Sequence, residues 1–187
     1  MRFSRNTLLI VVLAAAALSF ALLIYIHQRS AAPLSGQVGV NSGPVRLKIP
    51  RINLDAAVEH VGTAPDGAMD TPNGPDDVAW FDEGPLPGGK GSAVIDGHSG
   101  WKDGRAAAFD NLYKLHTGDK ITVEDGTGTT TSFVVREIRS YDPKADDREV
   151  FFSSDGKSHL NLITCEGVWD AVSKSYSKRL VVFADKE

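Results

Sequence analysis

Hydrophobic and polar positions divide the chain into two parts with different patterns. Twenty residues from Thr7 to Ile26 carry no charge, whereas the chain from Val45 onward consists of short apolar runs separated by glycine, proline and Asp-Gly turns. A helix of twenty residues is roughly 30 Å long, which is the thickness of the hydrocarbon core of a membrane. The first part therefore predicts a transmembrane helix, and the second predicts a β-rich domain.

The basic residues before the apolar run predict its orientation in a membrane. Arg2 and Arg5 precede the run, so the positive-inside rule places residues 1–6 in the cytoplasm and the rest of the chain outside. The apolar cores of cleaved signal peptides are shorter, about 7–15 residues, which favours an uncleaved anchor. Residues 27–44 are mostly small and polar, with glycine and proline, and predict a flexible linker. We expect one extracytoplasmic domain over residues 45–187.

The domain is predicted to be mostly β structure. Ile121 and Val123 alternate with polar neighbours at the period of two of a half-buried strand, and the poorer alternation of Thr130–Tyr141 predicts a bulge. Helical spacing of apolar residues occurs near Arg105–Leu115, so we expect one or two short helices. Eight short strands indicate a closed barrel or a sandwich, and we favour the barrel. The expected strands are Val45–Ile49, Leu54–Val61, Val78–Phe81, Ser92–Asp96, Lys120–Glu124, Thr130–Tyr141, His159–Cys165 and Arg179–Ala184.

Composition and charge narrow the class of protein. Hydrophobic residues make up 42% and charged residues 24%, as in ordinary globular proteins, and a net charge of −4 gives no sign of nucleic-acid binding. This net charge combines +3 for residues 1–44 with −7 for the remainder. One cysteine excludes an internal disulfide framework and a cysteine-rich metal site.

Cys165 and His98 are candidates for nucleophilic acyl chemistry. Each follows an apolar strand directly, at the point where reactive groups concentrate because strands open into loops. Glycines at 97 and 100 leave the backbone around His98 free to turn. A free thiol ionises near pH 8.5, so Cys165 needs an imidazole or a cation beside it to supply thiolate at neutral pH. Burial statistics alone favour a structural thiol, so both interpretations stay open.

Arg179 is a candidate for stabilising negative charge. It begins the last expected strand, and if that strand pairs antiparallel with the strand that ends at Cys165, the two residues lie at the same end of the barrel. The loop Glu166–Lys178 would then connect them. A fixed guanidinium at this place can hydrogen-bond a substrate carbonyl or a developing oxyanion. The alternative is an ordinary surface arginine.

Three segments, taken together and in order, resemble the sortase family. Ile163-Thr164-Cys165 is similar to the end of the sortase signature, Val94–His98 resembles the strand before the sortase histidine, and Arg179–Val182 resembles the sortase arginine strand. The resemblance extends over Val45–Lys186. Thr164–Asp170 is most similar to class F sortases, although the separation of 14 positions between Cys165 and Arg179 is longer than in several classes.

The resemblance implies a cysteine transpeptidase with a sortase-type barrel. We expect no cofactor and assign no metal ligands. A sorting signal of the Leu-Pro-x-Thr-Gly type, carried near the carboxyl terminus of a secreted protein, lies in a groove, and Cys165 attacks its threonine carbonyl. His98 protonates the departing glycine amine, and Arg179 with the Glu166 N–H stabilises the oxyanion. An amine of a cell-wall precursor or of a lysine on another protein then resolves the thioacyl enzyme.

Further residues are assigned smaller roles. Thr164, Glu166, Trp169 and Tyr176 are predicted to shape or line the substrate groove, although the two aromatic residues can equally anchor their loop. Lys174 is a second candidate for the cationic role, but lysine lacks the planar fork of arginine.

Two other functions use the same residues. A cysteine hydrolase would transfer the acyl group to water, and a non-catalytic wall-binding module would make Cys165 structural. The acidic residues between Asp66 and Glu83 lack the regular spacing of a calcium loop, so we favour a solvated face there.

Overall fold

The computed structural model describes residues 43–187, and eight strands and three short helices form in this part of the chain. The strands are β1 (Pro44–Ile49), β2 (Leu54–Val61), β3 (Val78–Phe81), β4 (Gly91–Gly97), β5 (Lys120–Asp125), β6 (Thr130–Tyr141), β7 (Ser158–Asp170) and β8 (Ser175–Lys186). The helices are η1 (Pro50–Ile52), η2 (Leu112–Lys114) and α2 (Arg148–Phe151). The predicted membrane segment lies outside the described residues, and from residue 43 onward no helix has the length and hydropathy to span a bilayer.

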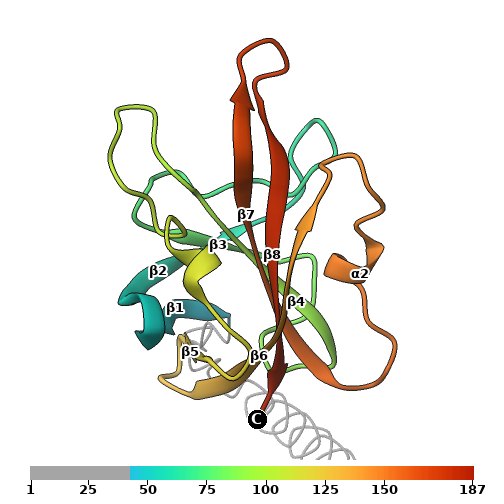
Figure 1. Ribbon diagram of the computed structural model, residues 1–187. Helices are drawn as coiled ribbons and strands as arrows, with labels where there is room; N and C mark the ends of the chain where they lie inside the picture. The colour runs from blue at the N-terminus through green and yellow to red at the C-terminus, as the bar shows by residue number, and fades with distance from the viewer. Residues whose placement is uncertain (1–42) are drawn as a thin grey trace, which may run out of the picture. The chain divides into compact units, whose positions relative to one another are not determined.

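The strands close into the predicted barrel, in the order β1-β2-β3-β4-β7-β8-β6-β5 (Figure 1). β4 and β7 pair in parallel, as do β2 and β3, while the other neighbours are antiparallel. β8 lies between β6 and β7 and pairs with both. The carboxyl end of β4 therefore lies beside the middle of β7, at the edge of the barrel from which β7 and β8 continue upward in Figure 1.

Alternating apolar side chains fill the barrel. Leu47 and Ile49 of β1 and Ile121 and Val123 of β5 are buried, while the residues between them face outward. The predicted bulge of β6 is confirmed, because the pairing with β8 shifts between Val135 and Glu137. The core is completed by side chains from the six other strands and from the segment after β4.

The helix predicted near Arg105–Leu115 is found only in part. Its apolar residues Phe109, Leu112 and Leu115 are buried in the barrel core, but the segment forms turns and the 3₁₀ helix η2 instead of an α-helix. The Phe109 N–H donates to the carbonyl of His98 instead of to a helical turn. Packing into the core therefore decides the conformation of this segment.

A second apolar cluster covers the outer face of β7 and β8. Val150 of α2 packs with Val181 and Phe183, and the Asn161 amide donates to the Val150 carbonyl at 2.5 Å. The sequence did not predict α2, which has only four residues. It lies beside the barrel in Figure 1 and forms one wall of the hollow described below.

The segment Glu166–Lys178 is a β-hairpin, so the prediction of a loop there is wrong. β7 and β8 continue through it, pairing Glu166 with Lys178 and Trp169 with Tyr176. This hairpin rises above the barrel in Figure 1. Its turn is formed by residues 171–174.

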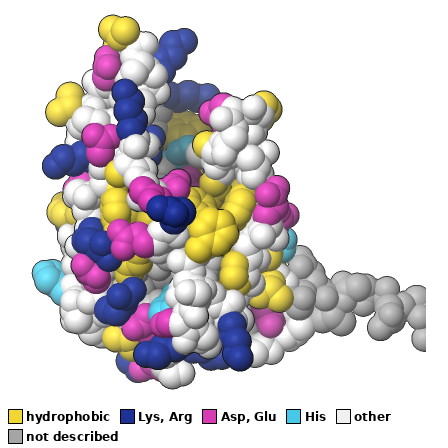
Figure 2. Space-filling view, turned by 90° about the vertical axis from the view of Figure 1, so that its right-hand side faces the viewer, with side chains coloured by type: hydrophobic (Ala, Val, Ile, Leu, Met, Phe, Trp, Pro, Cys, Tyr) yellow, Lys and Arg dark blue, Asp and Glu magenta, His cyan; other side chains and the backbone are white. Residues whose placement is uncertain are grey.

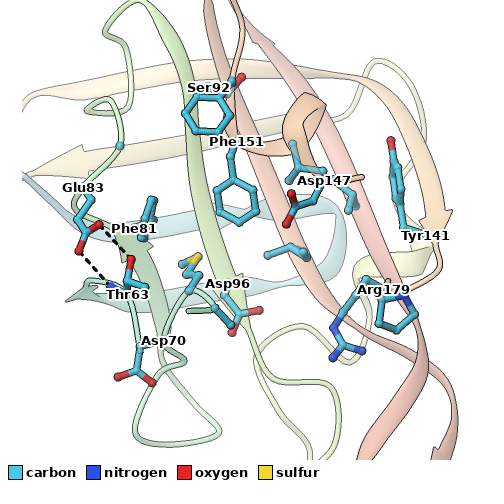
Figure 3. A pocket seen from close by; sticks show the side chains of 18 of the residues that line it. Thr63, Asp70, Phe81, Glu83, Ser92, Asp96, Tyr141, Asp147, Phe151 and Arg179 are labelled. Atoms are coloured by element: carbon cyan, nitrogen blue, oxygen red, sulfur yellow. Dashed lines mark hydrogen bonds between the residues drawn. The ribbon is translucent and has the colours of Figure 1, made fainter. Parts of the chain in front are cut away.

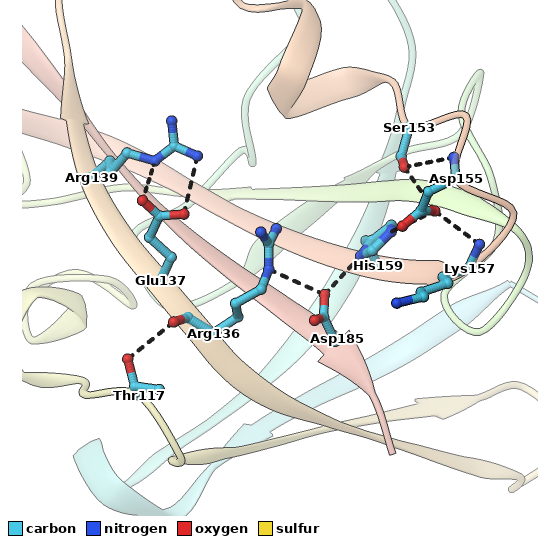
Figure 4. A network of polar contacts seen from close by, with 9 residues as sticks. All are labelled: Thr117, Arg136, Glu137, Arg139, Ser153, Asp155, Lys157, His159 and Asp185. Carbon is cyan, nitrogen blue, oxygen red and sulfur yellow. Dashed lines mark hydrogen bonds and ion pairs between the residues drawn. The ribbon is translucent and has the colours of Figure 1, made fainter.

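A polar network ties β7 and β8 to the β6–β7 connection (Figure 4). The His159 ring contacts Asp185 through Nδ1 at 2.7 Å and Asp155 through Nε2 at 3.0 Å. Hydrogen bonds from the Lys157 N–H and from His159 lower the pKa of Asp155 to about 2. The network holds the segment between α2 and β7 against the barrel.

Gly97, the last residue of β4, is predicted to tolerate no side chain. A Cβ there would lie 2.6 Å from the ring of Phe109, which is itself buried. We expect Gly97→Ala to lower the free energy of unfolding by about 1–3 kcal/mol, measured by urea denaturation. Gly74→Ala is the control, because nothing lies within 4 Å of a Cβ at that position. An equal effect of the two variants would contradict the packing argument.

Candidate active site

Three neighbouring strands bring polar side chains to one outer face of the barrel. On β4, Ala93 and Ile95 face the core, so the alternation turns Asp96 outward. On β7, Leu160 and Leu162 face the core and Cys165 lies on the other face, as predicted. Arg179 is the direct cross-strand partner of Cys165 on β8. The predicted juxtaposition of Cys165 and Arg179 is therefore found.

These residues open into a groove of about 980 Å³. Its lining includes Asp96, His98, Cys165 and Arg179, so the structure brings together the three predicted catalytic residues and one further acid. Phe81, Phe151 and Val181 give it apolar walls. Figure 3 shows Asp96 of β4 and Arg179 of β8, the two strands on either side of β7, together with Phe151. Figure 2 shows the hollowed face, with hydrophobic side chains surrounded by charged ones.

His98 is held at the end of β4 by contacts on two sides. Its Nε2 lies 2.9 Å from the carbonyl oxygen of Pro72, and since a carbonyl only accepts, Nε2 carries the proton. The Trp101 ring packs against the imidazole, with 4.9 Å between ring centroids. The side chain is half-buried. These contacts orient the imidazole at the rim of the groove.

Arg179 is fixed by its own hairpin. Its Nη1 donates to the carbonyls of Lys178 and Tyr176 at 3.0 and 3.3 Å, and its Nη2 donates to the Ser175 hydroxyl at 3.3 Å. A guanidinium has five N–H donors, so others stay available for a ligand in the groove. The cation is therefore preorganised beside Cys165.

The electrostatic balance at Cys165 has three contributions. Burial raises the pKa of the thiol, the Arg179 cation lowers it, and the Asp96 carboxyl raises it. Burial also raises the pKa of Asp96 to about 7, against the opposing effects of a hydrogen bond from the Gly97 N–H and of Arg179. Thiolate is accordingly the minor form of Cys165 at neutral pH.

Thr164 does not line the groove. It lies inside the barrel and is buried, and its hydroxyl donates to the Gly97 carbonyl at 2.6 Å. The side chain therefore ties β7 to the strand end that carries His98. It is placed to act on the groove through this strand end and does not line the groove itself, and its predicted role in shaping the groove stays a prediction.

The other predicted groove residues belong to the hairpin and its base. Glu166 hydrogen-bonds the Ser140 hydroxyl, while Trp169 and Tyr176 pack edge to face with 5.2 Å between ring centroids. None of these three side chains lines the groove. Lys174 lies at the tip of the hairpin, beyond the last strand pair, which leaves Arg179 as the cation beside Cys165.

Sequence reasoning missed Asp96. The signal that could have found it is an acid in the otherwise apolar strand Ala93–Ile95, two positions before the candidate histidine. An aspartate at such a place is uncommon because burial of its charge is costly.

A model of the sortase domain matches residues 47–187. The chain belongs to the sortase family. Among solved structures, this sortase is similar to sortase C1 of Streptococcus agalactiae in its complex with MTSET, with 26% identity over 78% of this chain and 70% of that chain and a TM-score of 0.61. No curated protein matches the sequence.

Two further solved sortases have the same degree of similarity. Sortase C-1 of Actinomyces oris is 25% identical over 86% of this chain and 81% of that chain, with a TM-score of 0.61. A lid mutant of sortase A from Corynebacterium diphtheriae is 28% identical over 82% and 75%, also with a TM-score of 0.61. Family membership confirms the predicted sortase and implies a cysteine transpeptidase, while the likeness to class F stays a prediction.

The hydrogen bond of Thr164 generates a test of its positioning role. Thr164→Val keeps the shape but leaves the Gly97 carbonyl without this donor, so we expect a loss of about 1–2 kcal/mol in the free energy of unfolding. Displacement of His98 should lower kcat about tenfold or more at unchanged KM. Thr164→Ser should restore both values. If Thr164→Val lowers stability but not kcat, the hydroxyl is only structural.

The charges on either side of Cys165 should shift its pKa in opposite directions. Arg179→Gln removes the cation that favours thiolate and should raise the pKa, whereas Asp96→Asn removes the anion that disfavours it and should lower the pKa. The pH dependence of the rate of iodoacetamide alkylation reports both shifts. Lys178→Gln, which removes an exposed neighbouring cation, is the control and should leave the profile in place. Shifts of the same sign for Arg179→Gln and Asp96→Asn would contradict this balance.

Proposed function

We propose that this sortase cleaves a Leu-Pro-x-Thr-Gly-like sorting signal between threonine and glycine and transfers the acyl group to an amine. The observation that carries the proposal is the convergence of His98, Cys165 and Arg179 on one groove. The donors of the signal are secreted proteins that bear it near their carboxyl terminus. The acceptor is an amine of a peptidoglycan precursor or of a lysine on another protein.

The first half-reaction forms the thioacyl enzyme. The Cys165 sulfur attacks the threonine carbonyl as thiolate, and a C–S bond forms while the carbonyl oxygen becomes an oxyanion. The free N–H groups of Arg179 and the backbone N–H of Glu166 stabilise this oxyanion. His98 gives a proton to the departing glycine amine as the C–N bond breaks.

The second half-reaction reverses these roles. The acceptor amine attacks the thioacyl carbon, His98 takes a proton from the attacking nitrogen, and the C–S bond breaks to return the Cys165 thiolate. The product is an amide between the signal and the acceptor. Water in place of the amine would give hydrolysis, which is the competing function of the same groove.

The walls of the groove support an apolar signal. Phe81 and Phe151 face each other edge to face with 5.7 Å between ring centroids, and Ile163 and Val181 lie on the floor strands. A Leu-Pro pair buries apolar surface against such walls, at about 25 cal/mol per Å². The Trp169–Tyr176 pair of the hairpin lies outside this lining and is available to contact residues farther along the substrate protein.

Anchoring in the cell membrane belongs to the same proposal. Residues 7–26 form the single-pass anchor with residues 1–6 in the cytoplasm, and residues 27–44 link it to the catalytic domain outside. The support is the uncharged run of twenty residues after Arg2 and Arg5. An acceptor of the cell wall lies on the same side of the membrane.

The replacement of Cys165 by alanine tests the proposal. Incubation with a Leu-Pro-x-Thr-Gly peptide and an amine should give a ligated product by mass spectrometry with the native chain, and Cys165→Ala should lower its rate about a thousandfold or more at an unchanged melting temperature. Retained cleavage would overturn the assignment. A product formed only with water would indicate a hydrolase, and a thiol that resists alkylation at neutral pH would indicate a binding module.

A further inference from the structure

Asp96 occupies a place in the groove that the mechanism above does not use. It lies on β4, two residues before His98, and its partner across the parallel pair is Ile163 of β7. Cys165 follows on the same face of β7, and Arg179 lies beyond it on β8. Cys165 thus lies between the Arg179 cation and the Asp96 carboxyl. Asp96 and His98 are on the same side of it, at the end of β4.

The Asp96 carboxyl has no ion-pair partner in the described part of the chain. The Gly97 backbone and the Arg179 cation both lower the pKa of this carboxyl, but by less than burial raises it. Asp96 is half-buried in the groove lining (Figure 3). A carboxylate there has lost part of its hydration without gaining a counter-ion, and a cationic ligand would supply one.

The charge of the whole groove favours the same kind of ligand. Arg179 and Lys90 are its two basic lining residues, while six further acids line it besides Asp96: Asp66, Asp70, Glu83, Asp142, Asp146 and Asp147. A cleft lined mainly by one sign of charge raises the local concentration of ligands of the opposite sign. The negative charge of the groove attracts cations, and the position of Asp96 determines where a cation binds.

We propose that Asp96 binds the ammonium group of the acceptor and takes one proton from it, which delivers a primary amine to the thioacyl group. The inference rests on the proposed function and names the acceptor class as a primary amine that is protonated at neutral pH, such as a lysine-type side chain.

The proton transfers balance. The ammonium gives one proton to the Asp96 carboxylate and becomes a neutral amine with a free electron pair. The nitrogen attacks the thioacyl carbon, a C–N bond forms, and a second proton goes from nitrogen to His98. The C–S bond then breaks, and its electron pair returns to the Cys165 sulfur. The neutral amide leaves, and solvent removes the protons from Asp96 and His98.

The local environment suits Asp96 to this task. Because burial raises the pKa of its carboxyl to about 7, Asp96 is a stronger base than an exposed aspartate. In the free enzyme much of it is neutral at neutral pH, which limits its unfavourable effect on the thiolate. An arriving ammonium favours the ionised form when the second substrate binds.

Partition of the thioacyl enzyme between amine and water tests the proposal. The full chain in detergent is acylated with a Leu-Pro-x-Thr-Gly peptide and offered either a lysine-type alkylamine or hydroxylamine, which is uncharged at neutral pH. Because the ratio of ligated to hydrolysed product is set after acylation, a slower first step does not alter it. Asp96→Asn should lower this ratio about tenfold or more for the alkylamine and less than about twofold for hydroxylamine. Asp96→Glu, which keeps the charge, should retain a larger part of the ratio.

Asp147→Asn is the matched control, because it removes the same charge from the opposite wall of the groove (Figure 3). An equal fall in the alkylamine ratio for both variants would mean that Asp96 contributes only to the overall negative charge of the groove. That result would overturn the proposal. An equal fall for both acceptors, or no fall with Asp96→Asn, would overturn it as well. A native chain that forms no thioacyl enzyme would instead refute the proposed function.

A measurement on the native chain keeps the proposal testable if Asp96→Asn does not fold. Tetramethylammonium is a cation that cannot attack a carbonyl, so it should compete with the alkylamine for Asp96 and leave the reaction with hydroxylamine unchanged. Sodium chloride at the same ionic strength corrects for screening. Equal inhibition by the two salts would contradict a specific ammonium site.

Discussion

The position of β7 between β4 and β8 is the constraint on which the active site depends. β7 pairs in parallel with the strand that carries His98 and antiparallel with the strand that carries Arg179. A shift of one residue in either register would turn Cys165 toward the barrel core and a core residue toward the groove. The hydrogen bond from Thr164 to the Gly97 carbonyl joins the first of these pairs at the level of the site. The packing of core side chains inside the barrel thus fixes the register. The same register places the catalytic side chains together on the outside.

Much of this arrangement could be predicted from local pattern. Short apolar runs separated by turn residues located all eight strands, and the irregular run Thr130–Tyr141 indicated its bulge. His98, Cys165 and Arg179 stood out because each lies where an apolar strand meets a loop. Their convergence followed from one assumption, that the strands of Cys165 and Arg179 are antiparallel neighbours.

The parts that could not be predicted depend on tertiary contacts. The segment around Phe109 has helical spacing, but its side chains enter the core and its backbone bonds to His98, so packing overrides the local preference. The hairpin of Trp169 and Tyr176 has polar and apolar residues without regular alternation, and pairing between its two strands supplies the order. The alternation with Cys165 placed Thr164 on the core face, where it lies, but its hydrogen bond to the Gly97 carbonyl depends on the pairing of β4 with β7. Asp96 was missed because its nearness to Cys165 depends on the pairing of β4 with β7, which the sequence of one strand does not reveal.

The groove combines two opposing electrostatic demands. A thiolate and an oxyanion favour cations, and Arg179 supplies one that is already held by the hairpin backbone. A protonated acceptor favours anions, which the groove also supplies in excess. In the proposed reaction, the separation of the two charges on β8 and β4, with Cys165 between them, lets one site meet both demands at different stages.

The position of β8 between β6 and β7 has a consequence for the order of events in folding. β8 is the last of the eight strands in chain order, and its pairing with β7 and β6 closes the barrel. Its pairing with β7 is local, across the turn of residues 171–174. Its pairing with β6 joins segments far apart in the chain, and such non-local pairing forms slowly. The hairpin therefore places Arg179 opposite Cys165 before the barrel closes, whereas the groove, which is also lined by Tyr141 of β6 and by α2, forms only after β8 has paired with β6. The pairing of β8 with β6 is thus the step that completes the groove around the thiol.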